Sequence, residues 1–232
     1  MTTTIYADGT YRDSNPDWHM ADSGWKARRV TDILERNSVA FETCVEVGCG
    51  AGLILEMLAG HFPDKCFIGF DVSPDAARFW AARKRPDMYR DEDFTVTSGT
   101  YDLLLLLDVF EHVPDYLGFL RSLGTRARSF VFHIPLEMHV SGLLRDRHVH
   151  ARQQVGHLHY FSKATALATL ADTGYEVVDT QLTKLSQETF ENVRVRTHMT
   201  NVARRGLEIV APDLAAKLLG GYSLLALCRP YG

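Results

Sequence analysis

The stretch from Glu46 to Gly52 combines residue types and a spacing that suit the binding of a nucleoside. Its sequence is Glu-Val-Gly-Cys-Gly-Ala-Gly, and it joins a short apolar run to a helix-like segment at residues 53–59. Glycines at alternate positions let the backbone turn tightly at positive φ and approach a ligand closely, while the helix that follows presents unpaired N–H groups at its start. We therefore expect a ligand at this turn.

A second candidate binding residue, Asp71, ends the apolar run 66–70 and lies about twenty residues beyond the glycines. Folds that bind a nucleoside at such a turn place here the carboxylate that accepts hydrogen bonds from the ribose diol. A glycine-rich turn alone is also explained by a tight loop without a ligand. The carboxylate at this distance favours a ligand that contains adenosine.

Two details of the turn argue against a dinucleotide. Leu53 occupies the sixth position of the dinucleotide fingerprint G-x-G-x-x-G, and the third glycine comes one place too early. The carboxylate of Glu46, just before the first glycine, gives a pyrophosphate nothing, but it would attract a ligand that carries an ammonium and a sulfonium. The predicted ligand is therefore cationic.

Three segments of the chain resemble, in order and spacing, the class I S-adenosylmethionine-dependent methyltransferases. They are Glu46 to Gly52, Asp71-Val72-Ser73, and the run from Tyr101 to Val113. The third segment is the most specific. A buried strand that ends in Asp-x-x-Glu-His-Val and continues with Pro-Asp is typical of the small-molecule branch of that family.

The resemblance implies S-adenosylmethionine as cofactor, S-adenosylhomocysteine as product and a small-molecule methyl acceptor. It places Asp71 on the ribose, Glu46 on the amino group and Lys26 on the carboxylate of the methionine portion. Asp91 and Glu92 compete with Asp93 for the adenine amine, and Trp25 suits core packing equally well. The full set of expected cofactor contacts is Glu46, Gly48, Cys49, Gly50, Gly52, Asp71, Val72, Ser73, Asp93, Phe94, Asp108, Val109, Phe110, Trp25 and Lys26.

Histidines are the candidate catalytic residues. Methyl transfer needs the acceptor and the methyl group brought together away from water, and a hydroxyl acceptor also needs a base, for which histidine is the natural choice near neutral pH. We select His112 and His157, because they lie in the two segments that match the family best. Packed or solvent-facing histidines are the alternative for each. The distribution of histidines along the chain slightly favours O-methylation. Seven of the ten histidines fall in the half of the chain expected to build the acceptor pocket: His112, His133, His139, His148, His150, His157 and His159.

A divalent metal is an alternative that the sequence leaves open, although the predicted site has none. Asp108, Glu111 and His112 present oxygen and nitrogen ligands on one strand-to-helix turn, and Glu137 and His139 follow the next strand. The competing explanation is that Glu111 and His112 only cap and position their turn.

The alternation of apolar and helical segments from residue 43 predicts an α/β fold. We expect a Rossmann-like, mostly parallel seven-stranded sheet with helices on both faces and its last strands antiparallel, so that ligands bind at the carboxyl ends of the strands. One domain, 1–232, should comprise an N-terminal lid at 1–37, a cofactor-binding core at 40–182, a helical insertion at 183–221 and a last strand at 222–228.

Composition excludes several other classes of protein. The chain has 232 residues, of which 46% are hydrophobic, and no linker divides it, so a single core is expected. Apolar runs are too short for a membrane helix, and Met1 to Thr10 lacks a signal-peptide pattern, so a cytoplasmic enzyme is expected. The net charge of −4 and the absence of a long basic run argue against a nucleic-acid substrate. The four cysteines form no C-x-x-C pair, so neither zinc nor a disulfide framework is indicated.

Two other functions remain open from the sequence. An NAD(P)-dependent oxidoreductase would place the glycine turn under a pyrophosphate, which Glu46 and the displaced glycine oppose. A non-catalytic S-adenosylmethionine-binding module would keep the same turn and Asp71, because these residues concern binding alone.

Overall fold

A computed structural model shows the arrangement of the chain and describes residues 15, 18, 20–81, 83, 85–184, 206–207 and 209–231. One sheet runs through it in the strand order β3-β2-β1-β4-β5-β7-β6. Strands β1 to β5 pair in parallel, and β7 pairs antiparallel with both β5 and β6. The predicted fold is therefore confirmed. The strands are β1 (Thr43–Val47), β2 (Cys66–Asp71), β3 (Tyr89–Asp91), β4 (Tyr101–Leu107), β5 (Ala127–Pro135), β6 (Tyr175–Lys184) and β7 (Tyr222–Pro230).

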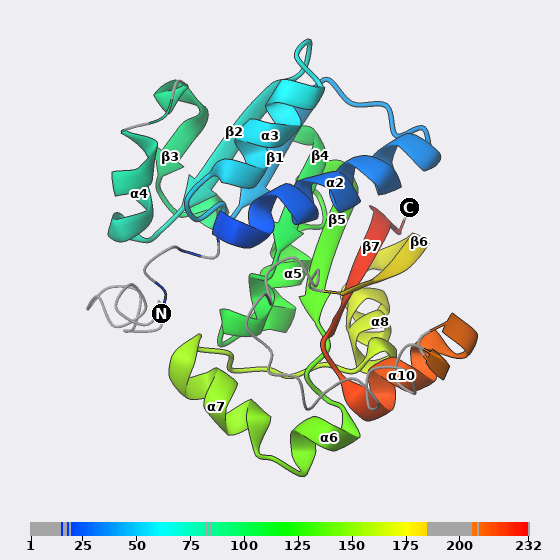
Figure 1. Cartoon of the computed structure of the whole chain (residues 1–232). Helices are drawn as coiled ribbons and strands as arrows, with labels where there is room; N and C mark the ends of the chain where they lie inside the picture. The colour runs from blue at the N-terminus through cyan, green and yellow to red at the C-terminus, as the bar shows by residue number, and fades with distance from the viewer. Residues whose placement is uncertain are drawn as a thin grey trace.

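Helices cover both faces of this sheet (Figure 1). One face packs against α2, α3 and α4, and the other against α5, α8 and α10. Short 3-10 turns connect several elements: η2 (Pro86–Met88), η3 (Phe94–Val96) and η4 (Phe110–His112). The α-helices are α2 (Met20–Arg36), α3 (Leu53–His61), α4 (Pro74–Trp80), α5 (Tyr116–Leu123), α6 (Val140–Leu143), α7 (Arg147–Gln154), α8 (Lys163–Asp172) and α10 (Pro212–Leu219).

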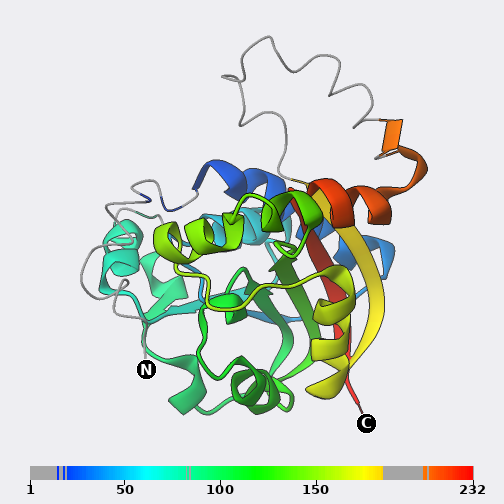
Figure 2. The ribbon, with the colours of Figure 1, turned by 90° about the horizontal axis from the view of Figure 1, so that it is seen from below.

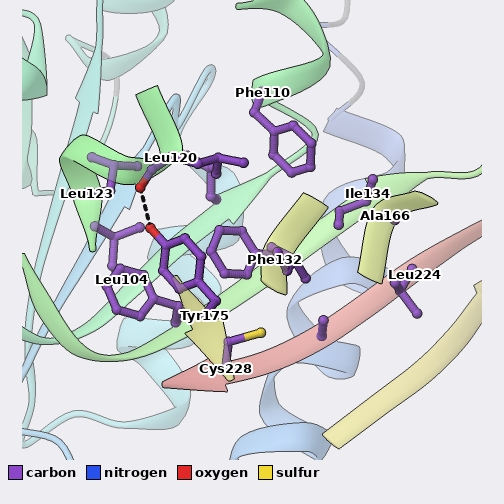
Figure 3. Close-up of a cluster of buried hydrophobic side chains, with 14 of the residues drawn as sticks. Leu104, Phe110, Leu120, Leu123, Phe132, Ile134, Ala166, Tyr175, Leu224 and Cys228 are labelled. Carbon is purple, nitrogen blue, oxygen red and sulfur yellow. Dashed lines mark hydrogen bonds between the residues drawn. The ribbon is translucent and has the colours of Figure 1, made fainter. Parts of the chain in front are cut away.

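The run of leucines in the sequence forms strand β4, which is buried on both faces of the sheet. Leu103, Leu105 and Leu107 face the α2 side of the sheet, whereas Leu104 and Leu106 face the α5 side. A parallel strand covered on both faces reads as continuously apolar because every side chain is buried. On the α5 side, Figure 3 shows Tyr175 beside Phe132, with its hydroxyl donating to the carbonyl of Leu120 at 2.6 Å.

Local sequence signals set the ends of the helices. The side chain of Asp115 accepts a hydrogen bond from Gly118 N at 2.9 Å and so caps α5. Ser162 and Thr165 form a capping box at the start of α8. Pro74 stands in the first turn of α4, where its missing N–H costs nothing.

Several boundaries differ from the sequence-based expectation. The spacing of apolar residues predicts helices at Trp25 to Asn37 and at 74–84, but α2 begins at Met20 and α4 ends at Trp80. Helices α6 and α7 lie within residues 136–160, a stretch for which the sequence predicts no helix. They lie with α10 at the end of the sheet where β5 finishes and β7 begins (Figures 1 and 2). The beginning of the expected lid, residues 1–14, and most of the expected insertion, residues 185–205, lie outside the described residues. No helix in the described part of the chain is long and apolar enough to cross a membrane.

Candidate functional site

A cavity of about 1030 Å³ opens at the carboxyl ends of β1, β2 and β4. Parallel α/β sheets bind ligands at this edge, because the loops that follow the strands meet there. Fifteen of the seventeen residues predicted for the site line the cavity: Lys26, Glu46, Gly48, Cys49, Gly50, Gly52, Asp71, Val72, Ser73, Asp93, Phe94, Asp108, Val109, His112 and His157.

The glycine turn is built so that only glycine fits. Gly48, Gly50 and Gly52 have φ values of +73°, +52° and +79°. A Cβ on Gly48 would lie 2.6 Å from Cγ2 of Val109, and one on Gly52 would lie 2.4 Å from the ring of Tyr89. The hydroxyl of Tyr89 in turn donates to the carbonyl of Gly52 at 2.9 Å, which fixes the entry to α3. The turn therefore brings the backbone itself to the wall of the cavity.

Asp71 ties this turn to the end of β2. Its Oδ2 accepts from Gly50 N and its Oδ1 accepts from Ser73 N, both at 2.8 Å. Burial raises the pKa of Asp71, and the two backbone N–H groups act in the opposite direction. The carboxylate is held in a fixed orientation at the cavity wall, with lone pairs remaining for a ligand diol.

Glu46 is the residue that best shows what the cavity can hold. It is 2% exposed, and its Oε2 has no hydrogen-bond partner among the described residues. Burial raises the pKa of Glu46 to about 8, although the charge of Lys26 acts to lower it. A buried carboxylate without a partner is costly, so a cationic ligand group beside it would be bound with a gain in free energy.

Asp93 and Phe94 form the wall beyond β3. Asp93 accepts from the backbone N and the Oγ1 of Thr95, at 2.8 and 2.7 Å, and so caps η3. Phe94 is buried, and the Arg126 guanidinium lies 4.2 Å from its ring centroid. Asp93 and Glu92 line the cavity, whereas Asp91 does not. Two of the three acids therefore remain as candidates to bind the adenine amine.

Three charged residues meet where β4 and β5 end. Lys26 Nζ donates to Asp108 Oδ2 at 2.6 Å, and the Nδ1 of His133 lies 2.6 Å from Asp108 Oδ1. Burial acts to raise the pKa of Asp108, but His133 and Lys26 together hold it well below its usual range. Lys26 was expected to meet a carboxylate of the cofactor, and in the structure its carboxylate partner is Asp108.

His133 bridges two strands of the sheet through both of its ring nitrogens. Its Nε2 lies 3.0 Å from Thr183 Oγ1, and that hydroxyl donates its single proton to the carbonyl of Ser223 at 3.2 Å. The imidazole of His133 therefore links Asp108, at the end of β4, to Thr183 on β6.

Trp25 and Phe110, the two other predicted cofactor contacts, do not line the cavity. Trp25 is buried with its ring edge-on to His133, 5.9 Å between centroids. Phe110 is fully buried among Tyr116, Phe132 and Phe161. Large aromatic rings gain more from apolar contact than from a water-filled cavity, so both side chains turn into the core.

The opposite wall of the cavity gathers the candidate catalytic histidines. The rings of His112 and His157 lie 4.7 Å apart, although 45 residues separate them in the chain (157 − 112). Glu111 is fully buried, and neither of its carboxylate oxygens has a hydrogen-bond partner in the described ranges. His157 Nδ1 lies 2.8 Å from Glu137 Oε2. The backbone N–H groups of residues 158 and 159 donate to the carbonyl of Glu111 at 2.8 and 3.1 Å, which fastens the two segments together.

Sequence reasoning missed the role of His133 and the partner of Glu111. His133 was counted among the histidines but given no role, although a histidine inside the apolar run 130–134 is a signal of a buried, partnered side chain. Glu111 was considered as a metal ligand together with Asp108 and His112, and its closeness to His157 had no local signal. Asp108 is instead held by Lys26, and the Nδ1 of His139 accepts from Gly142 N at 3.0 Å as the cap of α6.

The parallel sheet, the glycine turn and the oriented Asp71 together define a Rossmann-like nucleoside-binding domain. The sequence also matches the family described as "Methyltransferase domain" over residues 19–180, so the chain belongs to that family. A comparison with curated proteins finds no match.

Solved methyltransferase structures share this fold at low sequence identity. The plantazolicin methyltransferase BpumL, in complex with a monoazolic substrate analogue and S-adenosylhomocysteine, is 13% identical with a TM-score of 0.65, over 99% of this chain and 93% of that chain. The 1,6-didemethyltoxoflavin-N1-methyltransferase of Burkholderia thailandensis is 13% identical with a TM-score of 0.63, over 99% and 88%. The magnesium protoporphyrin IX methyltransferase of Synechocystis PCC 6803 is 16% identical with a TM-score of 0.55, over 89% and 78%.

Proposed function

We propose that this protein transfers a methyl group from S-adenosylmethionine to an oxygen atom of a small molecule. The observation that carries the proposal is the buried, unpartnered Oε2 of Glu46 beside the glycine turn, in a cavity whose other wall holds His112 and His157. The similar enzymes crystallised with S-adenosylmethionine or its product support the choice of cofactor. When bound, this cofactor supplies a methyl group on a positively charged sulfur.

The residues on the side of the cavity formed by the glycine turn each bind a different part of the cofactor. Glu46 faces the ammonium, Asp71 accepts hydrogen bonds from the ribose diol, and Phe94 packs against the adenine with Asp93 beside it. Lys26, which lines the cavity beside Asp108, faces the carboxylate of the methionine portion. Opposite charges are thus matched at both ends of the amino-acid portion.

The histidines on the opposite side of the cavity act on the acceptor. Glu137 bonds to Nδ1 of His157, which orients the ring and leaves Nε2 to face the cavity. His112 and His157 then hold the acceptor hydroxyl and assist loss of its proton. A volume of about 1030 Å³ accommodates the amino-acid nucleoside together with a small acceptor.

The proposal is tested by supplying S-adenosylmethionine with a tritiated methyl group and panels of small phenols, alcohols and amines. Label recovered on oxygen in one class of acceptor supports the assignment. Label on nitrogen alone would contradict the oxygen acceptor. Binding of S-adenosylhomocysteine without transfer to any acceptor would favour the non-catalytic binding module.

A further inference from the structure

We propose that Glu111, His112 and His157 bind a divalent transition-metal ion at the acceptor wall, and that this ion takes the acceptor oxygen. The binding site itself stands on the geometry of these residues alone. The role of the ion in catalysis rests on the proposed methyl transfer.

The three side chains already converge on one point. One ligand atom from each lies within 4.8 Å of the other two. Ligands bound to a common ion at 2.0–2.2 Å lie roughly 3 to 4 Å from one another, so closure needs only small side-chain rotations. The backbone bonds between Glu111 O and residues 158 and 159 hold the two contributing segments together while the side chains adjust.

Glu111 supplies an independent argument for an ion. It is fully buried, and both of its carboxylate oxygens lack a hydrogen-bond partner among the residues described. A buried acid without any partner costs free energy that packing does not repay. A cation bound by this carboxylate would remove that cost, because it would give both oxygens the partner that they lack.

Glu137 orients His157, one of the three ligands. Its Oε2 bonds to Nδ1 of His157 at 2.8 Å, so Nε2 is the nitrogen left for an ion. Metal-binding histidines usually donate their second N–H to a carboxylate in this way, which fixes the tautomer and makes the ring a better ligand. The exposed pair His61 and Glu35, also 2.8 Å apart, belongs to no group of three possible metal ligands among the described residues, so it serves as a comparison.

The ligand set indicates which ion binds. Two imidazoles and one carboxylate suit Mn²⁺, Fe²⁺, Co²⁺ or Zn²⁺, whereas Mg²⁺ and Ca²⁺ prefer oxygen ligands throughout. Three protein ligands leave coordination positions open toward the cavity that His112 and His157 line. An acceptor with two adjacent oxygen atoms, such as a catechol or a hydroxy ketone, would fill them.

The ion would ease the loss of the acceptor proton. A hydroxyl bound to a divalent ion has a lowered pKa, so it releases its proton to solvent near neutral pH. The oxygen lone pair then forms the bond to the methyl carbon, and the sulfur keeps the electron pair of the bond that breaks. One proton leaves for each methyl group transferred, and no oxidant or reductant is required.

The test is a titration of chelator-treated protein with MnCl₂, followed by the loss of the EPR signal of free Mn²⁺. We expect one strong site in the wild type, affinity at least about tenfold weaker in Glu111→Gln and in Glu137→Gln, and unchanged affinity in His61→Gln. Equimolar Zn²⁺ should displace Mn²⁺, and equimolar Mg²⁺ should not. Wild-type protein that binds no Mn²⁺, or equal affinity in Glu111→Gln, would overturn the site, and displacement by Mg²⁺ would overturn the choice of ion.

The same samples separate this inference from the proposed function. Glu111→Gln keeps the shape of the side chain, and a melting curve like that of the wild type shows that it has folded. S-adenosylhomocysteine is titrated into chelator-treated protein by calorimetry. If the protein binds S-adenosylhomocysteine but no Mn²⁺, the metal proposal is contradicted and the proposed function is not. A Mn²⁺ site without product binding supports the metal site and contradicts the proposed function.

Discussion

Lys26 on helix α2 and Asp108 at the end of strand β4 form a partly buried ion pair inside the cavity, with Nζ and Oδ2 2.6 Å apart. Asp108 has a φ of +56°, a conformation that costs energy in any residue other than glycine. The pair therefore fastens α2 to the sheet edge and holds a strained residue at the point where β4 turns into η4.

Replacing Lys26 should be strongly destabilising. Lys26→Met keeps the aliphatic stem but leaves Asp108 with one charged partner fewer. We expect a loss of about 2 kcal/mol in the free energy of unfolding, measured with urea, less than a fully buried pair would lose because the side chains remain 14% and 25% exposed.

The matched control is Lys65→Met, which breaks a similar 2.8 Å ion pair with Glu42 whose carboxylate side chain is 77% exposed. It should change stability by less than about 1 kcal/mol. Equal losses in the two variants would mean that the Lys26–Asp108 pair does not fasten α2.

Glu46 should make the stability of the ligand-free protein fall as pH rises. Burial raises its pKa from 4.5 to about 8, so the folded state binds more protons than the unfolded state between these values. The effect is absent below the ordinary pKa and complete above the raised one, with a slope of at most about 1.4 kcal/mol per pH unit. Urea unfolding of Glu46→Gln from pH 5 to pH 8 should show a flatter dependence than the wild type, and parallel curves would contradict the raised pKa.

The glycine turn should not tolerate a side chain at Gly52. Its φ of +79° and the 2.4 Å approach of an added Cβ to Tyr89 predict a loss of about 1–3 kcal/mol in Gly52→Ala, together with weaker binding of S-adenosylhomocysteine. Gly60→Ala, at a helical glycine with no atom within 4 Å of its added Cβ, should be neutral or stabilise by up to about 1 kcal/mol. Equal effects in thermal melts would refute the steric argument.

His157 should matter for turnover and not for cofactor binding. With an acceptor in hand, His157→Gln should lower kcat by about a hundredfold, because the acceptor oxygen loses the group that assists its ionisation. The affinity for S-adenosylhomocysteine should stay within about twofold. His61→Gln should leave both quantities unchanged. A parallel loss of product affinity in His157→Gln would place this residue at the cofactor instead.

The fold and the cofactor wall could be predicted because their signals are local. The turn from Glu46 to Gly52, the carboxylate at Asp71 and the leucine run of β4 each report their own backbone conformation and burial. Trp25 and Phe110 are next in sequence to residues that line the cavity. The pattern of apolar residues does not show whether a single aromatic ring points into the cavity or into the core. Helix α7 was missed because its segment is polar and buries no residue, and α6 was missed because it has only four residues.

The acceptor wall could be predicted only as two separate histidines. His112 and His157 meet because η4 and the segment after α7 are joined by backbone bonds across the sheet edge. The partnership of Lys26, Asp108 and His133 likewise draws on α2, β4 and β5, which are far apart in the chain. Such contacts depend on tertiary packing and leave no spacing for sequence reasoning to recognise.

The central claim is that the cavity binds S-adenosylmethionine, and thermal melting with added ligand tests it most directly. A ligand that binds only the folded state stabilises it by about 2.7 kcal/mol at a hundred times its Kd. We predict a rise in Tm with S-adenosylmethionine and S-adenosylhomocysteine, its loss in Asp71→Asn, and no shift with NAD⁺ or NADH. A shift with the nicotinamide cofactors, or with none of the four ligands, would contradict the account.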